Sequence, residues 1–208
     1  MKRRDFLRRL GLMTLGALAF PAAGMKLAAA QIAGENEKAS LIEPPYIYRR
    51  FLTFTEYELR PRTDFLVIHH TGFPTDKDSS VTEIHDFHLH NNGWAGAGYH
   101  YFIQKDGTLE QGRRPMMVGA HAYGFNKESI GIALAGNFDI GRPTKEQIKT
   151  LKHLTAWLCQ EYALDPTKKG TILGHRDLNE TTCPGNALYD RLEEIRESCA
   201  TQLTLKGR

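Results

Sequence analysis

Two segments of the chain, roughly a hundred residues apart, carry the residue types that bind metals. The first is the apolar run 65–71, which contains the pair His69-His70. The second is segment 173–185, which contains His175 and Cys183. Catalytic zinc takes three ligands from the protein and keeps a fourth position for water, whose pKa it lowers to about 7. Two histidines and one cysteine therefore predict a hydrolytic zinc site.

Spacing leaves open which histidine of the pair would bind the ion. Neighbouring side chains of a strand point to opposite faces, so only one of His69 and His70 can face it. A second group, His85, His88 and His90, lies in a predicted helix, where His85 and His88 would share a face. No cysteine or carboxylate cluster accompanies them, so we expect a packed or exposed helix face there.

Strands and helices must position these ligands. Apolar runs and the turn signal Asp106-Gly107 predict five strands, of which the second and third form a hairpin. A helix over 81–91 ends at Asn-Asn-Gly, and a capping box at Thr144 and Gln147 starts another helix. The strands are predicted at 65–69, 99–104, 108–113, 129–135 and 171–175, and a final helix is predicted from the stripe Leu188, Leu192, Ile195 and Cys199.

These elements predict one α/β domain with a mixed central sheet of about five strands, flanked by about three main helices. Cys159 and Cys199 fall on apolar helix stripes and are expected in the core, although a disulfide between them is possible in an exported protein. The zinc domain is predicted over residues 59–208, preceded by a polar lead-in over residues 31–58.

Residues 1–30 have the features of an export signal. Basic residues precede an apolar run from Leu10 to Phe20, which is shorter than the roughly 20 residues that a bilayer span needs. Ala28-Ala29-Ala30 offers a cleavage site. The start Arg3-Arg4-x-Phe6-Leu7 resembles a twin-arginine signal. We expect a soluble periplasmic or extracellular protein with no membrane span in its mature form.

The basic charge of the chain belongs mainly to this signal. Of 27 Lys and Arg and 24 Asp and Glu, residues 1–30 hold six and one, which leaves 21 basic and 23 acidic residues and a net charge of −2. The mature chain therefore gives no indication of a nucleic-acid partner.

Several further segments follow the metal-binding pair in order: 93–94, 98–103, 105–107, 119–122 with Asn126, 129–132, 136–138, and 174–177 with 181–185. Together with 67–71, they resemble the zinc-dependent N-acetylmuramoyl-L-alanine amidases, which include phage amidase lysozymes and peptidoglycan recognition proteins. The resemblance covers roughly residues 60–200. It implies a peptidoglycan or muropeptide substrate, cut between the lactyl group of N-acetylmuramic acid and L-alanine.

The resemblance also assigns roles to single residues. It makes His69, His175 and Cys183 the Zn²⁺ ligands and so chooses His69 over His70. It makes Tyr99 a catalytic residue. It implies that the hydroxyl of Thr181 stabilises the oxyanion. Some bacterial members carry a carboxylate where this chain has Ala133 and Ala135, which leaves the general acid for the leaving amine unassigned.

Three more residues are predicted to contact substrate: His121, Trp94 and Asn126. Packing would explain Trp94 equally well, and turn geometry would explain Asn126. His70 and His100 are expected to make internal hydrogen bonds. The alternative functions are a non-catalytic peptidoglycan-binding module and a zinc hydrolase of another amide. Cys183 favours catalysis, because relatives that only bind peptidoglycan usually have serine there.

Overall fold

The computed structural model describes residues 41–206, so the predicted export signal lies outside the described part. A six-stranded mixed sheet has the order β1-β4-β3-β5-β2-β6. β2, β5 and β6 are parallel, β3 is parallel to β5, and β3 and β4 form the predicted antiparallel hairpin. The strands are β1 (Tyr48–Arg49), β2 (Phe65–His70), β3 (Tyr101–Ile103), β4 (Leu109–Gln111), β5 (Ser129–Leu134) and β6 (Ile172–Gly174).

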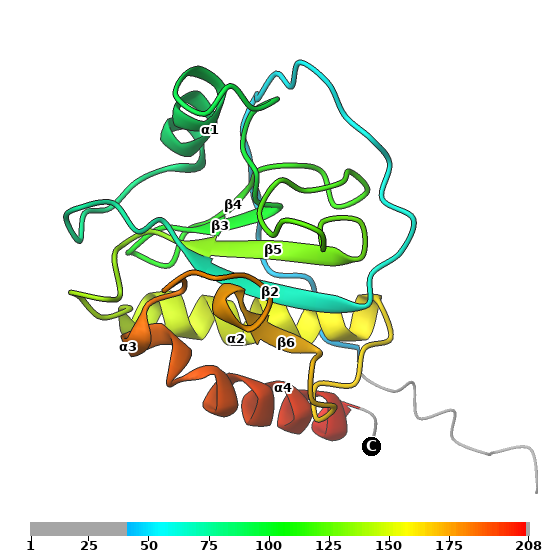
Figure 1. Cartoon of the computed structure of the whole chain (residues 1–208). Coiled ribbons are helices and arrows are strands. Elements are labelled where there is room, and N and C mark those ends of the chain that lie inside the picture. The colour runs from blue at the N-terminus through cyan, green and yellow to red at the C-terminus, as the bar shows by residue number, and fades with distance from the viewer. Residues whose placement is uncertain (1–40, 207–208) are drawn as a thin grey trace, which may run out of the picture. The chain divides into compact units, whose positions relative to one another are not determined.

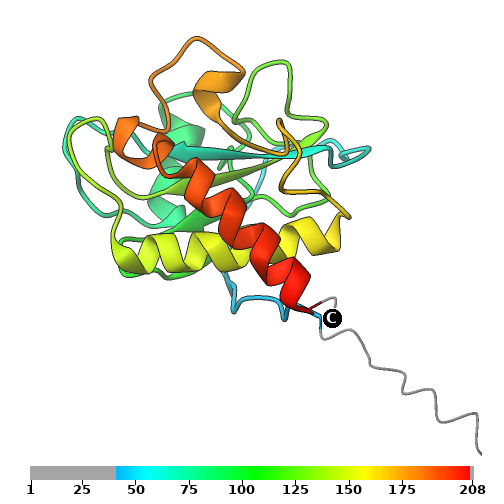
Figure 2. The ribbon, with the colours of Figure 1, turned by 90° about the horizontal axis from the view of Figure 1, so that it is seen from below.

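Helices cover the two faces of the sheet unequally (Figure 1). α2 (Lys145–Glu161) and α4 (Leu192–Lys206) cross each other on one face, as Figure 2 shows from below. α1 (Val81–His90) and long loops lie over the other face. Leu66 and Ile68 of β2 join the larger core beneath α2 and α4. Because strand side chains alternate, Val67 and His69 face the side of α1.

The predicted helix starts are confirmed. Thr144 Oγ1 accepts the backbone N–H of Gln147, and the side-chain oxygen of Gln147 accepts the backbone N–H of Thr144. Ser80 and Glu83 form the same capping box at α1. Each box satisfies backbone donors that the first turn of a helix leaves free, which fixes where the helix begins.

The predicted final helix is two helices, α3 (Asn186–Tyr189) and α4, separated by a turn at Asp190 and Arg191. Leu188, Leu192 and Cys199 are nevertheless all buried. The turn keeps the apolar stripe in phase, so the periodicity does not reveal the break.

Part of the polar lead-in belongs to the sheet and core. β1 pairs with β4 and is the strand that the sequence does not predict. Ile42 is buried in the larger core, and its backbone exchanges hydrogen bonds with the side chain of Gln160 on α2. Arg50 donates to the fully buried carboxylate of Glu110, which also accepts the first N–H of α1 from Val81. Residues 41–50 therefore connect the sheet edge to both helical layers.

Cys159 and Cys199 are buried between α2 and α4 as free thiols, so the predicted core placement is confirmed. A hydrogen bond between the two thiols that favours protonated Cys159, together with burial, raises the pKa of Cys159. Among the described residues, no helix has the length and apolar character needed to cross a bilayer.

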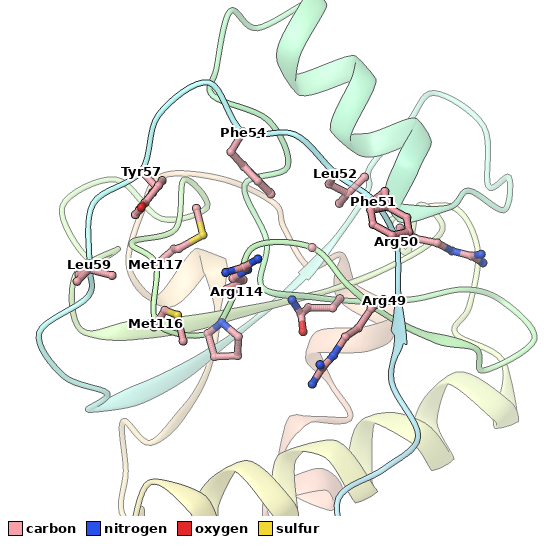
Figure 3. A pocket seen from close by; sticks show the side chains of 13 residues that line it. Arg49, Arg50, Phe51, Leu52, Phe54, Tyr57, Leu59, Arg114, Met116 and Met117 are labelled. Carbon is pink, nitrogen blue, oxygen red and sulfur yellow. The ribbon is translucent and has the colours of Figure 1, made fainter.

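A cavity of ≈ 740 Å³ lies at the β1–β4 edge (Figure 3). Its walls come from the lead-in, including Phe51 and Tyr57, and from the segment that contains Arg114 and Met116. None of the predicted metal ligands lines it.

Candidate metal centre

His69, His175 and Cys183 meet at the C-terminal ends of β2 and β6. Each offers one ligand atom, and these atoms all lie within 4.8 Å of one another. β2 and β6 are adjacent and parallel, so His69 and the residue after β6, His175, emerge at the same edge. The loop after His175 returns Cys183 to this edge, where Arg176 N–H donates to the Cys183 carbonyl. The three predicted ligands are therefore brought together.

The donor atoms suit zinc. In a tetrahedral zinc site, bond lengths near 2.05 Å to nitrogen and 2.3 Å to sulfur place two such ligand atoms about 3.6 Å apart. Nδ1 of His69 lies 3.6 Å from Sγ of Cys183. The His70 backbone N–H also points at this sulfur, 3.5 Å away, and would stabilise a thiolate. His70 itself is turned away and accepts a hydrogen bond from Phe138 N–H.

The second ring nitrogen of each histidine ligand has its own partner. Nε2 of His69 lies 3.1 Å from Nδ1 of His121. Nε2 of His175 lies 3.1 Å from the side-chain oxygen of Asn179. Both rings therefore present Nδ1 to the cluster, and outer partners of this kind orient metal ligands. The sequence does not predict a role for Asn179; its spacing of four residues from His175 is the available signal.

Burial dominates the electrostatics of the cluster. It lowers the pKa of His69 well below its ordinary value, with the neighbouring histidines adding to the effect, and it lowers the pKa of His175. Burial raises the pKa of the Cys183 thiol to about 12, partly offset by the His70 N–H and by Arg176. The histidines are thus neutral, as metal ligands must be, and the thiol needs a cation to ionise near neutral pH.

Tyr99 lies beside the cluster, just before β3. Its ring centroid is 5.1 Å from that of His69 and 5.5 Å from that of His88. Burial raises the pKa of Tyr99 above its ordinary value. The phenol therefore keeps its proton near neutral pH and can donate a hydrogen bond.

Thr181 precedes Cys183 by two residues and is exposed. Its Oγ accepts the backbone N–H of Cys183 at 3.2 Å. Because Oγ is an acceptor in this bond, its own proton is free to be donated to another group. Ala133, which pairs with His69 in the sheet register, supplies no carboxylate beside the cluster.

Two predicted substrate contacts have different surroundings. Trp94 is 40% exposed, and its ring packs on His88, with centroids 4.7 Å apart. Asn126 uses its side-chain oxygen to accept the backbone N–H groups of His121 and Ala122. Trp94 therefore remains available to a ligand, while the oxygen of Asn126 is occupied in shaping its own loop.

His121, the third predicted substrate contact, is buried, and its Nδ1 lies 3.1 Å from Nε2 of His69. The other histidines have internal roles. His100 accepts Gly131 N–H and bonds to the carbonyl of Met117, as expected. His85 and His88 are buried and accept the N–H groups of residues 97 and 98, which anchors the loop that leads to Tyr99.

Comparison with known proteins identifies the fold. Residues 59–186 match the family described as N-acetylmuramoyl-L-alanine amidase. The chain belongs to this family. The solved N-acetylmuramoyl-L-alanine amidase LysC from Clostridium intestinale superposes with a TM-score of 0.66 at 34% identity, covering 74% of this chain and 96% of that one.

Two animal proteins and a phage protein illustrate the spread of the family. Peptidoglycan-recognition protein LB of Drosophila melanogaster is 34% identical over 60% of this chain, which spans 56% of its length. The N-acetylmuramoyl-L-alanine amidase of Homo sapiens is 33% identical over 66% of this chain, which spans 25% of its length. The endolysin of Escherichia phage T7 is 33% identical over 62% of this chain and 85% of its own length. The amidase family thus joins recognition proteins and endolysins on one fold.

Proposed function

We propose that this protein is a zinc-dependent amidase that cuts the bond between the lactyl group of N-acetylmuramic acid and the L-alanine of the stem peptide. The observation that carries the proposal is the convergence of His69, His175 and Cys183, with donor atoms within 4.8 Å of one another. Family membership supports the bond class. A related Drosophila recognition protein has been solved as a mutant in complex with tracheal cytotoxin, which supports a ligand from peptidoglycan.

His69 and His175 would hold the ion through Nδ1, and Cys183 through its sulfur. Bound zinc activates water and polarises the amide carbonyl. Thr181, whose hydroxyl proton is not used in its bond to Cys183 N–H, would donate a hydrogen bond to the oxygen that becomes negative as the amide is attacked. Tyr99, which keeps its proton and lies beside His69, would orient the water or the same oxygen. Trp94 forms part of the substrate-binding wall.

We further propose that residues 1–30 direct export and that the enzyme acts outside the cytoplasm. The basic start, the short apolar run and the alanine cleavage site support this. Expression in cells with and without a working twin-arginine system, followed by fractionation, tests the route. Processing after Ala30 in both strains would contradict it.

Mass spectrometry of digested muropeptides tests the activity and the bond together. The purified protein should release stem peptides with a free L-alanine amine and leave a free lactyl carboxyl group. Chelation should abolish release, and zinc should restore it. Cys183→Ala should be inactive, whereas Cys159→Ala, at a buried cysteine outside the cluster, should remain active.

Three results would contradict the proposal. Activity of Cys183→Ala would exclude the assigned ligand. A new peptide carboxyl group would show that another amide is cut. Binding to peptidoglycan without cleavage, in zinc-loaded protein, would show a recognition module.

A further inference from the structure

His121 is a buried histidine for which the proposed reaction has no direct use. Its ring meets that of His69 edge to face, with centroids 5.1 Å apart, and Nδ1 lies 3.1 Å from Nε2 of His69. We propose that His121, held by Ser129 and the carbonyl of Phe125, is a positioning residue that fixes the tautomer of His69 and so aims its Nδ1 lone pair at the metal. This inference rests on the proposed zinc site.

The Phe125 carbonyl is the last acceptor in the series of hydrogen bonds from His69 through His121 and Ser129, and it sets the direction of each of them. Ser129 Oγ lies 2.6 Å from the carbonyl oxygen of Phe125, which can only accept. The hydroxyl proton of Ser129 is therefore committed to that carbonyl. Oγ must then accept from Nε2 of His121, 3.4 Å away, so His121 carries its proton on Nε2.

The proton position on His121 in turn sets the proton position on the proposed metal ligand His69. With its proton on Nε2, His121 has a lone pair on Nδ1 and can only accept there. Nε2 of His69 must supply the proton for the 3.1 Å bond between the two rings. A neutral imidazole protonated on Nε2 has its lone pair on Nδ1, which is the atom that lies 3.6 Å from Cys183 Sγ.

His100 does not offer His121 another hydrogen-bonding partner. The two rings pack edge to face with centroids 5.5 Å apart. Both nitrogens of His100 are occupied, Nε2 at 2.9 Å from the Met117 carbonyl and Nδ1 at 3.0 Å from Gly131 N. His100 therefore packs against the ring of His121, and Ser129 determines which ring nitrogen of His121 carries the proton.

Two glycines make room for His121. A Cβ atom added to Gly131 would lie 2.5 Å from Cγ and Cδ2 of His121, and one added to Gly119 would also collide with the ring. Real Cβ atoms essentially never come that close. Ser129 and Gly131 sit two residues apart on β5, so their side-chain positions face the same way. The segment Ser-Ile-Gly thus both orients and accommodates His121.

Tautomers are measurable directly in the metal-free protein. Two-dimensional ¹⁵N spectra of histidine side chains separate rings protonated on Nε2 from rings protonated on Nδ1. We expect His69 and His121 both in the Nε2-protonated form. Ser129→Ala should convert part of the His69 signal to the other form or to exchange. An Nδ1-protonated His69 in the unmutated protein would overturn the inference without any variant.

Zinc affinity supplies the second readout, measured by competition with a chromophoric chelator. Ser129→Ala should weaken binding by up to about 10- to 100-fold, the range for loss of an outer partner of a metal ligand, because Ser129 acts on His69 through the outer partner His121. Ser79→Ala is the matched control, because Ser79 Oγ is buried but has no hydrogen-bond partner in the described part of the chain. It should bind zinc as the unmutated protein does.

The two readouts separate the possible failures. Unchanged zinc affinity and an unchanged His69 tautomer in Ser129→Ala would overturn the role of His121. If the unmutated protein binds no zinc but shows the expected tautomers, the proposed metal site is excluded, while the role of His121 in fixing the tautomer of His69 is supported.

Discussion

At the scale of single residues, Cys183 is the proposed ligand whose protonation would change most when a metal binds. The thiol is buried and has a pKa near 12, while burial keeps His69 and His175 neutral. Metals bind the thiolate and so displace its proton. Metal binding at the proposed site would therefore exchange a proton for a cation at one atom, the sulfur of Cys183.

We predict that zinc binding at pH 6 releases about one proton, because zinc-bound water, with a pKa of about 7, stays mostly neutral at that pH. Calorimetry in buffers of different ionisation enthalpy measures this number. Cys159→Ala should release the same amount. Zinc binding with no proton release would show that the thiol is not a ligand.

The second residue prediction concerns Thr181. Thr181→Val removes the hydroxyl that we assign to the oxyanion, and loss of one such donor costs typically ~100-fold or more in kcat. Zinc content should not change. Thr181→Ser should retain most activity, and Thr182→Val, at the neighbouring threonine that bonds Asp139, is the control. Equal kcat values for Thr181→Val and the unmutated protein would exclude the role.

At the scale of elements, buried histidines hold the loops around the site. Nδ1 of His88 accepts Gly98 N–H beside α1, and Nδ1 of His100 accepts Gly131 N–H on β5. Burial lowers the pKa of His88 to about 4 and that of His100 to about 3. Protonation at Nδ1 would remove each of these bonds, so both elements depend on neutral histidines.

These pKa values predict acid destabilisation. The unfolded chain takes up protons at histidine near pH 6.5, while folded His88 does so only near pH 4. In that window the unfolded state binds more protons, so the free energy of unfolding falls as pH falls, by about 1.4 kcal/mol per pH unit for each such histidine.

Denaturant unfolding of metal-free protein between pH 7 and 4 measures this slope. His88→Asn should reduce it, and His90→Asn, at an exposed position on the same helix, should not. An unchanged slope in His88→Asn would contradict the assignment.

At the scale of the whole molecule, residues 41–50 of the lead-in connect the edge of the sheet to the helices. Glu110 has no exposed side-chain surface, and Arg50, which is 47% exposed, pairs with it at 2.7 Å. Removing one partner leaves a buried carboxylate without its cation. The remaining bond from Val81 N–H lessens the cost.

We therefore predict that Arg50→Ala lowers the free energy of unfolding by about 1–3 kcal/mol, as expected for an unsatisfied buried group. Combining it with Glu110→Gln should recover part of the loss, because the amide carries no charge. Arg49→Ala is the control, since the described part of the chain gives Arg49 no ion pair. An equal loss of unfolding free energy in Arg50→Ala and Arg49→Ala would show that the ion pair between Arg50 and Glu110 does not stabilise the attachment of the lead-in.

The sequence predicts the elements whose pattern is local. Five strands, the hairpin turn at Asp106-Gly107 and the capping box at Thr144 depend on neighbours in the chain, and all are found. β1 is missed because its two exposed residues are held by β4, far along the chain. The burial of His121 is missed for a similar reason, since Gly131 supplies the space for its ring.

The family match spans residues 59–186, but residues on both sides of it also pack into the domain. Before it lie Ile42, β1 and Arg50, and after it lies α4, which covers the sheet together with α2. A fragment cut at the match would contain every assigned ligand, yet it would lose one of the two long helices on that face of the sheet and leave Glu110 without its guanidinium partner. The segment that contains the assigned ligands is therefore shorter than the segment that we expect to fold stably.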